Sequence, residues 1–412
     1  MDRNAKYLAI LTATVVIAGL ASLAVNVVVD PYGIHRVVSI AGVNAIKPAV
    51  ETKVRLTKAY QMIRTKPEIV VLGNSRVESG IDTDLASEVA KRNIFNVGLP
   101  GSTIYELYRY LQHAQAIRPL TRAVLALDVY SFNTNWARTA NDYLEERLRV
   151  HPDGSRVRYL NLNRIRDLRN LYLSISSLDS ARFTVLNQNQ DWASDRTDTG
   201  FNPMVDAEYY FDRGYHHVFF RKAQGYYRNS QRRGMNFAPS DEWPEGAMRY
   251  FRDIVAFCRR EGIALRLYIH PYHAHVLEIM RMTGIWSQFE DWKRQVVAIV
   301  AEDADRHPDS PPIQIWDFSG YNAVTTEPVP PEGDVASVMR WYWEASHYKK
   351  AVGTEIVKVM YQVGVPAPGA RPFGVRIDDS TIEQHLADIR AMGQQYRHDR
   401  AEEVADLEAW IR

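Results

Sequence analysis

Three segments of the chain carry groups suited to acyl transfer: a serine nucleophile, a base with its acid, and a backbone N–H donor. Ser75 lies in the segment Gly73-Asn74-Ser75-Arg76, which follows the apolar run 69–72. A serine at a strand-to-helix turn presents its hydroxyl at the edge of a sheet, and its backbone N–H lies where developing negative charge is stabilised. Taken alone, a Gly-x-Ser after a buried strand is more often a structural turn.

A histidine and an acid stand near the other end of the chain, in Glu344-Ala345-Ser346-His347. His347 could take the proton of the Ser75 hydroxyl and later return it to a leaving oxygen. Glu344, three residues earlier, could bind the second imidazole nitrogen and favour the charged ring. Taken alone, His347 is as well explained as a helix-end residue and Glu344 as a surface acid. Together with Ser75 they predict acyl transfer by a covalent intermediate.

The segment 96–101, Asn-Val-Gly-Leu-Pro-Gly, offers a backbone donor for an oxyanion hole. The N–H of Gly101 could join the N–H of Ser75 in stabilising a tetrahedral intermediate. A plain turn before the next helix explains the same glycines equally well.

The elements that must position these residues alternate along the chain. Short, wholly apolar runs are typical of strands buried on both faces of a parallel sheet, and ligands bind at the carboxyl ends of such strands. The pattern predicts a three-layer α/β/α sandwich with a central parallel sheet, in which the candidate residues follow strands. Strands are predicted at 69–72, 93–97, 123–127, 265–269 and 313–316, and helices at 54–63, 103–118, 244–260, 286–302, 347–363 and 381–411.

The α/β alternation is interrupted once, and we predict a long insertion after the third strand, at about 130–239, covering one side of the sheet. The predicted organisation is an N-terminal membrane anchor at 1–30, a connecting segment at 31–66, an α/β domain at 67–368 and a helical C-terminal tail at 369–412.

The N-terminus predicts export. Arg3 and Lys6 precede the uncharged run 7–29, which is long enough to cross the hydrocarbon core of a bilayer. The basic leading tail favours a cytoplasmic N-terminus, with the rest of the chain outside the cytoplasm. A cleaved signal peptide is the alternative, since residues 22–24 resemble a cleavage site, but the apolar run continues to Val29. Both interpretations export the domain.

Composition argues against several classes of function. The 50 basic and 49 acidic side chains give a net charge of +1, so no nucleic-acid partner is predicted. The single Cys258 excludes an internal disulfide and a cysteine-based metal site. His270 and His273 follow the fourth predicted strand and are candidates for the pocket lining. With His275 their spacing matches no standard zinc pattern, so neither a metal nor another cofactor is predicted.

The three segments, in this order, resemble the first, second and fifth sequence blocks of the SGNH or GDSL-type hydrolases. The resemblance implies a flavodoxin-like SGNH fold, Ser75 as nucleophile, Gly101 in the oxyanion hole and His347 as base. Glu344 stands where that family usually has Asp. The family's third block, Gly-x-Asn-Asp, whose Asn is a third oxyanion donor, is absent, and the sequence there runs from Asp128 to Asn133. The resemblance weakly implies Asn133 or Tyr130 as that donor, whereas Asp128 also fits a buried structural acid. The further residues expected near the pocket are Asn74, Arg76, Asp128, Tyr130, His270 and His273.

A looser resemblance concerns the anchor, the segment 30–33 (Asp-Pro-Tyr-Gly), and the segments 72–76 and 343–348. It is to membrane-tethered SGNH-like proteins of bacterial envelope and exopolysaccharide systems, including relatives of the alginate acetylation proteins. This implies a single-pass inner-membrane protein with a periplasmic or extracellular domain. The implied partners are an acylated or acyl-accepting glycan and a membrane-bound O-acyltransferase.

Two functions follow. The first is a serine acyl esterase or O-acyltransferase acting on acyl groups, most simply acetyl groups, of an envelope glycan. The sequence does not decide between hydrolase and transferase, because the steps up to the acyl-enzyme are the same. The second is an inactive SGNH-like scaffold that binds polysaccharide or a membrane synthase or acyltransferase partner, its oxyanion hole disabled by the missing third-block Asn.

Overall fold

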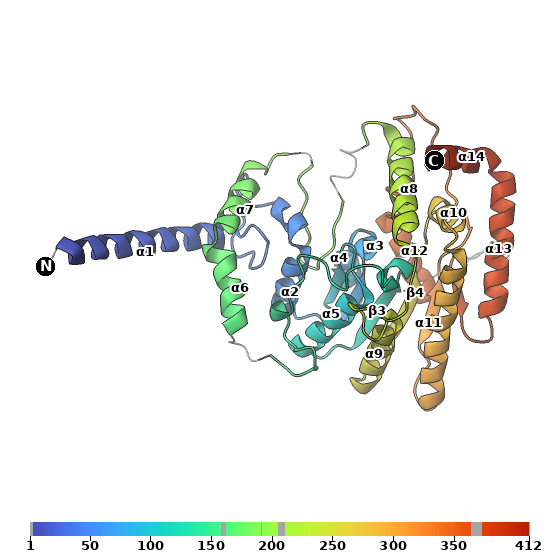
Figure 1. The fold of residues 1–412 in the computed structure, drawn as a ribbon, viewed down its shortest axis with the longest axis horizontal. Helices are drawn as coiled ribbons and strands as arrows, with labels where there is room; N and C mark the ends of the chain where they lie inside the picture. Colours follow the sequence, from blue (N-terminus) through green and yellow to red (C-terminus); the bar gives the residue numbers. More distant parts are fainter. Residues whose placement is uncertain (1–2, 158–161, 191, 205–210, 364–372, 412) are drawn as a thin grey trace.

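A computed structural model describes residues 3–157, 162–190, 192–204, 211–363 and 373–411. Its centre is a six-stranded sheet with helices around it (Figure 1), in the strand order β2-β1-β3-β4-β5-β6. The strands β1 to β5 are mutually parallel, and only β6 runs antiparallel to its neighbour. The strands are β1 (Ile69–Gly73), β2 (Ile94–Gly98), β3 (Arg122–Leu127), β4 (Ala264–Ile269), β5 (Gln314–Asp317) and β6 (Val375–Ile377).

The helices alternate with the strands through most of the sheet. Helices α5, α9 and α11 pack against one another, and α3 packs against α12. The helices are α1 (Arg3–Val29), α2 (Val54–Thr65), α3 (Ser75–Gly80), α4 (Thr83–Ala90), α5 (Ile104–Ile117), α6 (Leu162–Leu173), α7 (Ile175–Leu186), α8 (Gly214–Arg233), α9 (Ala247–Arg260), α10 (Ala274–Met282), α11 (Trp286–Arg306), α12 (Lys350–Met360), α13 (Ile382–Asp399) and α14 (Ala401–Ile411).

All five predicted strands are confirmed to within one residue at each end. The strand register aligns the carboxyl ends of β1 and β2, because Gly73 lies opposite Gly98. On the other side, Leu127 of β3 lies opposite Ile269 of β4, which lies opposite Asp317 of β5. The segments that follow these strands therefore leave the sheet at one edge, as the sequence predicted.

Two features of the sheet and its surroundings differ from prediction. The sheet is not wholly parallel, because residues in the predicted helical tail form β6 and pair with β5. The predicted domain boundary at residues 368 and 369 lies outside the described residues. The insertion also does not cover one side of the sheet: α6 and α7 pack on α1, while α8 packs on α10 and α14.

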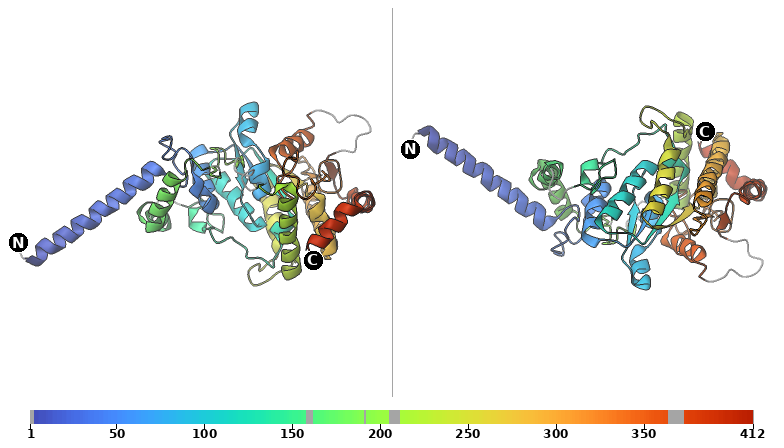
Figure 2. Two further views of the ribbon diagram at one scale, coloured as in Figure 1. Left: turned by 90° about the horizontal axis from the view of Figure 1, so that it is seen from above. Right: turned by 90° about the horizontal axis from the view of Figure 1, so that it is seen from below.

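Helix α1 is long and apolar enough to cross a membrane, which is in keeping with the predicted anchor. It projects away from the rest of the molecule in all three views (Figures 1 and 2), and its side chains are exposed along most of its length. Only its last turns are enclosed: Ser22, Asn26 and Val29 are buried.

Helices α3 and α12 approach so closely that two glycines are required at their contact. A Cβ built on Gly353 of α12 would lie 1.8 Å from the carbonyl oxygen of Gly80, and one on Gly80 would lie 2.1 Å from the ring of Tyr348. Helix α3 begins at Ser75, and α12 begins three residues after His347. The contact therefore fixes the separation of these two residues.

We predict that Gly353→Ala lowers the free energy of unfolding by about 1–3 kcal/mol, because the added methyl group meets backbone that cannot move aside cheaply. The measurement is the unfolding midpoint of the full chain in detergent. Gly225→Ala on α8 is the control, since a Cβ there meets no atom within 4 Å. It should stabilise the chain by about 0.5–1 kcal/mol, as replacing a helical glycine does. Equal midpoints for the two variants would contradict the packing argument.

Candidate active site

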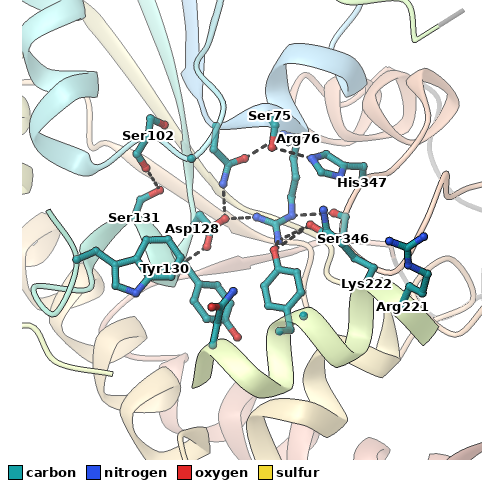
Figure 3. A pocket seen from close by; sticks show the side chains of 16 residues that line it. Ser75, Arg76, Ser102, Asp128, Tyr130, Ser131, Arg221, Lys222, Ser346 and His347 are labelled. Atoms are coloured by element: carbon teal, nitrogen blue, oxygen red, sulfur yellow. Dashed lines mark hydrogen bonds and ion pairs between the residues drawn. The ribbon is translucent and has the colours of Figure 1, made fainter. Parts of the chain in front are cut away.

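Two of the three residues singled out for acyl transfer, Ser75 and His347, meet at the carboxyl edge of the sheet (Figure 3), and Glu344 contacts His347. The imidazole Nε2 of His347 lies 2.7 Å from the Ser75 hydroxyl oxygen. Its Nδ1 makes a close hydrogen bond with Oε1 of Glu344. Ser75 and His347 are 272 residues apart in the sequence. The predicted contact of hydroxyl, imidazole and carboxylate is therefore present. The longer Glu side chain reaches the ring that an Asp would otherwise hold.

Ser75 is placed by the turn between β1 and α3. Asn74 is the N-cap of α3, and its side-chain oxygen accepts a hydrogen bond from the N–H of Arg76. The amide nitrogen of Asn74 at the same time contacts the carboxylate of Asp128. Both ends of the Asn74 amide are thus engaged, which fixes the backbone on either side of the Ser75 hydroxyl.

His347 is placed by a tight loop closed on itself. Tyr342 and Tyr348 form an isolated antiparallel bridge, and the N–H of Trp343 donates to the carbonyl of His347 at 2.8 Å. Within this loop, Oε2 of Glu344 accepts from the N–H of Ser346 at 2.7 Å. One carboxylate oxygen therefore holds the loop backbone and the other holds the imidazole, so the ring orientation follows from the loop.

The charges around the imidazole set its protonation. Burial alone would raise the pKa of Glu344, but Lys222 and His347 outweigh it and lower that pKa to about 2. The ammonium of Lys222 lies 3.5 Å from Oε1 of Glu344. Burial lowers the pKa of His347 below its ordinary value, although Glu344 acts in the opposite direction. The ring is therefore neutral near pH 7 and able to accept a proton, beside an ionised Glu344.

Two backbone N–H groups remain available at the cavity, those of Ser75 and Gly101. Ser75 is the first residue of α3, where an N–H has no partner within the helix. Gly101 has a φ of +61°, a left-handed conformation in which a side chain would be strained. In the part of the chain that the structure describes, neither N–H donates to a protein acceptor. The pair fits the predicted oxyanion hole.

Arg76 joins the serine loop to the histidine loop. It is buried, and its guanidinium pairs with Asp128, the carboxylate that follows β3. Its Nε donates to the carbonyl of Ser346 at 2.8 Å, and one Nη donates to the Ser346 hydroxyl at 3.0 Å. Asp128 also accepts from the hydroxyl of Tyr272 at 2.9 Å. Asp128 is therefore the buried structural acid that the sequence allowed, and Arg76 positions the segment between Glu344 and His347.

Three residues predicted for the oxyanion hole or the pocket lining do not line the cavity. The amide of Asn133 is used elsewhere, donating to the carbonyl of Gly234 at 2.8 Å, so the weakly predicted third oxyanion donor is wrong. His270 is buried behind the site, where its Nδ1 lies 3.2 Å from the hydroxyl of Tyr348 and burial lowers its pKa to about 3. His273 caps α10, since its ring accepts from the N–H of His275.

One wall of the cavity comes from the insertion, which sequence reasoning did not connect with the site. Helix α8 contributes polar and aromatic side chains opposite Ser75 (Figure 3). Their spacing along one helical stripe was a usable signal, since i, i+4 and i+8 share a face. The cavity measures about 320 Å³, and Asn74, Arg76, Asp128 and Tyr130 line it as predicted. The α8 residues at the wall are Arg221, Lys222, Gly225, Tyr226 and Asn229.

No protein-family model matches this chain, and no match was found among curated proteins. The functional argument therefore rests on the contacts within the cavity. An imidazole that is neutral, oriented by a carboxylate and bonded to a hydroxyl can generate an oxygen nucleophile. Two free backbone donors beside that hydroxyl can stabilise the resulting oxyanion.

We predict that Arg76→Met lowers the free energy of unfolding by about 3–5 kcal/mol, because it leaves the Asp128 carboxylate buried without its cation. Denaturant unfolding of the full chain in detergent is the measurement. The matched control is Arg294→Met, which removes a cation paired at the surface with Glu383. Exposed pairs contribute about 0–1 kcal/mol, so this control should unfold close to wild type. Similar losses in the two variants would contradict the role given to Arg76.

Proposed function

We propose that this protein is an exported serine acyl esterase or O-acyltransferase that works through a Ser75-His347-Glu344 triad. The observation that supports this most directly is the 2.7 Å contact between the Ser75 hydroxyl and the neutral Nε2 of a ring bonded to Glu344. A half-buried serine with a purely structural role needs one partner, and a carbonyl would serve. The arrangement of base, carboxylate and free backbone donors around one hydroxyl favours catalysis.

The reaction proceeds in two displacements. The Ser75 oxygen attacks the ester carbonyl carbon while Nε2 of His347 takes the hydroxyl proton, and the carbonyl oxygen becomes an oxyanion held by the N–H groups of Ser75 and Gly101. The tetrahedral intermediate collapses, the bond to the alcohol oxygen breaks, and His347 protonates that oxygen as it leaves. Water or a sugar hydroxyl then attacks the acyl carbonyl carbon while His347 takes its proton. The bond from the acyl carbon to the Ser75 oxygen breaks, and His347 returns the proton to that oxygen. Water gives hydrolysis, and a sugar hydroxyl gives transfer.

The substrate class and cellular setting are part of the proposal. In this interpretation the fold is a three-layer SGNH-type sandwich, α1 is a retained anchor in a bacterial inner membrane, and the cavity faces the periplasm. Cleavage after residue 24 would remove Ser22, whose hydroxyl binds the carbonyl of Tyr172, so this contact supports retention. The acyl donor or acceptor is an acetylated or acetyl-accepting envelope glycan. Where a separate acyl donor is needed, a membrane-bound O-acyltransferase supplies the acyl group.

A second candidate function is an inactive scaffold that binds polysaccharide or a membrane synthase partner. The observation in its favour is the position of Asn133, whose amide binds Gly234 instead of facing the cavity. The oxyanion hole then contains backbone donors without a side-chain amide. Loss of one oxyanion-hole donor typically lowers the rate by a factor of roughly 10²–10³. A hole that has two backbone donors and lacks the side-chain amide therefore predicts a slow enzyme, not an inert one.

We predict that a fluorophosphonate probe labels Ser75 in the full chain and that Ser75→Ala abolishes the labelling. The labelled residue is located by mass spectrometry, and the same variant is assayed for acetate release from a chromogenic ester. Ser131→Ala is the control, because this serine borders the cavity but its hydroxyl donates to the carbonyl of Ser102 at 2.7 Å and meets no base. It should retain labelling. Equal acetate release by wild type and Ser75→Ala would rule out the proposed nucleophile.

We predict that Lys222 sets the position of the acidic limb in the pH profile of kcat/KM. The neutral form of His347 is the base, so activity falls as the pH drops through the pKa of His347. Lys222 lowers that pKa, and Lys222→Met should therefore move the acidic limb of kcat/KM to higher pH. Arg221→Met removes the same charge from the neighbouring position, and the ion pair to Glu344 comes from Lys222. A larger shift in the Arg221 variant than in the Lys222 variant would contradict the assignment.

A further inference from the structure

The helical hairpin α6–α7 is joined directly to the end of α1. The hydroxyl of Ser22 and the amide of Asn26 both donate to the carbonyl of Tyr172, at 3.0 and 2.9 Å. Tyr172 lies in the last turn of α6, where carbonyl groups have no partner within the helix. Two polar groups near the end of α1, the Ser22 hydroxyl and the Asn26 amide nitrogen, are thus bonded to the end of α6, which ties the hairpin to α1.

The attachment of α1 to the rest of the chain is also rigid. The carboxylate of Asp30 accepts hydrogen bonds from the backbone N–H groups of Ile34, His35 and Arg36, at 2.7 to 2.9 Å. The ammonium of Lys47 donates to the carbonyl of Val29 at 2.7 Å, so the end of α1 is capped from the body of the protein. The direction of α1 is therefore fixed relative to the hairpin and the sheet.

The contact sites give the depth of the hairpin along α1. A helix rises about 1.5 Å per residue, so Asn26 and Ser22 lie about 5 and 10 Å before Val29, the last apolar residue of the helix. A bilayer crossed by α1 would therefore place the α6–α7 turn at the boundary between headgroups and acyl chains. Interfacial helices lie about 5–10 Å into that boundary. Figure 1 shows α6 and α7 running across the axis of α1, along the direction of such a surface.

The hairpin exposes apolar side chains that a fully solvated protein would cover. Ile175 at the start of α7 is 86% exposed, and Phe183 and Leu186 follow it at i+8 and i+11 on the same helical face. Val37, in the loop after α1, is 79% exposed. Clusters of exposed apolar side chains mark contact with a membrane or a partner. The other exposed apolar residues of this region are Val38, Ile40, Ile165 and Leu173.

The charges on the same helices suit an anionic lipid surface. Arg166 and Arg169 on α6 and Arg182 on α7 are exposed, against the single exposed acid Asp179 in the described part of the two helices. Arginine beside an apolar stripe is the composition of helices that bind the membrane interface, where basic residues are attracted to anionic headgroups.

We propose that the α6–α7 hairpin, with the loop 37–40, is embedded in the surface of the same lipid bilayer that α1 crosses. The protein is then attached at two places, one across the membrane and one along its surface. A single spanning helix leaves a domain free to tilt and turn about its attachment, whereas a rigid second contact sets the height and direction of the cavity above the bilayer. This inference rests on α1 and the hairpin alone and does not depend on acyl transfer.

The test places a fluorophore on the hairpin in a bilayer. The full chain carries Cys258→Ser, which removes the one native thiol, and Ile175→Cys labelled with an environment-sensitive nitrobenzoxadiazole dye. It is reconstituted in nanodiscs of phosphatidylcholine and phosphatidylglycerol, with and without doxyl-labelled phosphatidylcholine. We expect blue-shifted emission and at least twofold quenching by the doxyl lipid. A second probe at Phe183→Cys, on the same face of α7, should respond in the same way.

The matched control is Val335→Cys, since Val335 is 65% exposed and lies beside Gly214 at the start of α8. Helix α8 lies in the part of the molecule away from α1 (Figure 1), so this probe should not be quenched. Quenching at Ile175 and Phe183 no greater than at Val335 would overturn the proposal. Blue-shifted emission without lipid quenching would also overturn it, because the face would then be covered by a second copy or by another protein.

Discussion

The candidate site depends on one buried guanidinium. Arg76 follows Ser75 in the chain, pairs with Asp128 after β3, and binds the carbonyl of Ser346 between Glu344 and His347. Three loops that leave three different strands or helices are thereby held at one point. A buried cation tolerates few alternative positions, because each one would leave a desolvated charge unpaired. The 2.7 Å contact of hydroxyl and imidazole is therefore a consequence of where Arg76 must lie.

The same constraint explains the protonation of the site. Burial is the main cause of the lowered pKa of His347, and the charges of Lys222 and then Arg76 lower it further. Lys222 also keeps Glu344 ionised. In a site of low dielectric these cations favour a neutral ring, and they favour negative charge that develops on a substrate oxygen. Glu344 alone would act in the opposite direction and hold the ring protonated. The cations and the carboxylate together give a base that is oriented yet still able to accept a proton.

The sequence predicted those parts of the structure that arise from local patterns. The apolar runs predicted all five parallel strands, and the helix predicted at 103–118 begins at Ile104, after a capping box formed by Thr103 and Glu106. The contact of Ser75 with His347 was predictable because parallel strands share a carboxyl edge. Strand β6 was missed because it has only three residues, two of them exposed, and pairs only with β5 as an edge strand. Asn133 was misplaced because the destination of its amide, Gly234, is about 100 residues away and no local pattern indicates it.

The insertion contacts both α1 and the cavity that contains Ser75. Its first two helices bind the end of α1, and its third helix forms the wall of the cavity opposite Ser75. Between them, Arg196 is buried and paired with Glu78 of α3, two residues after Arg76 and three after Ser75. A continuous set of packed and ion-paired residues therefore connects the apolar helix to the serine loop. A rotation of the serine loop relative to the insertion would break the buried Arg196–Glu78 pair.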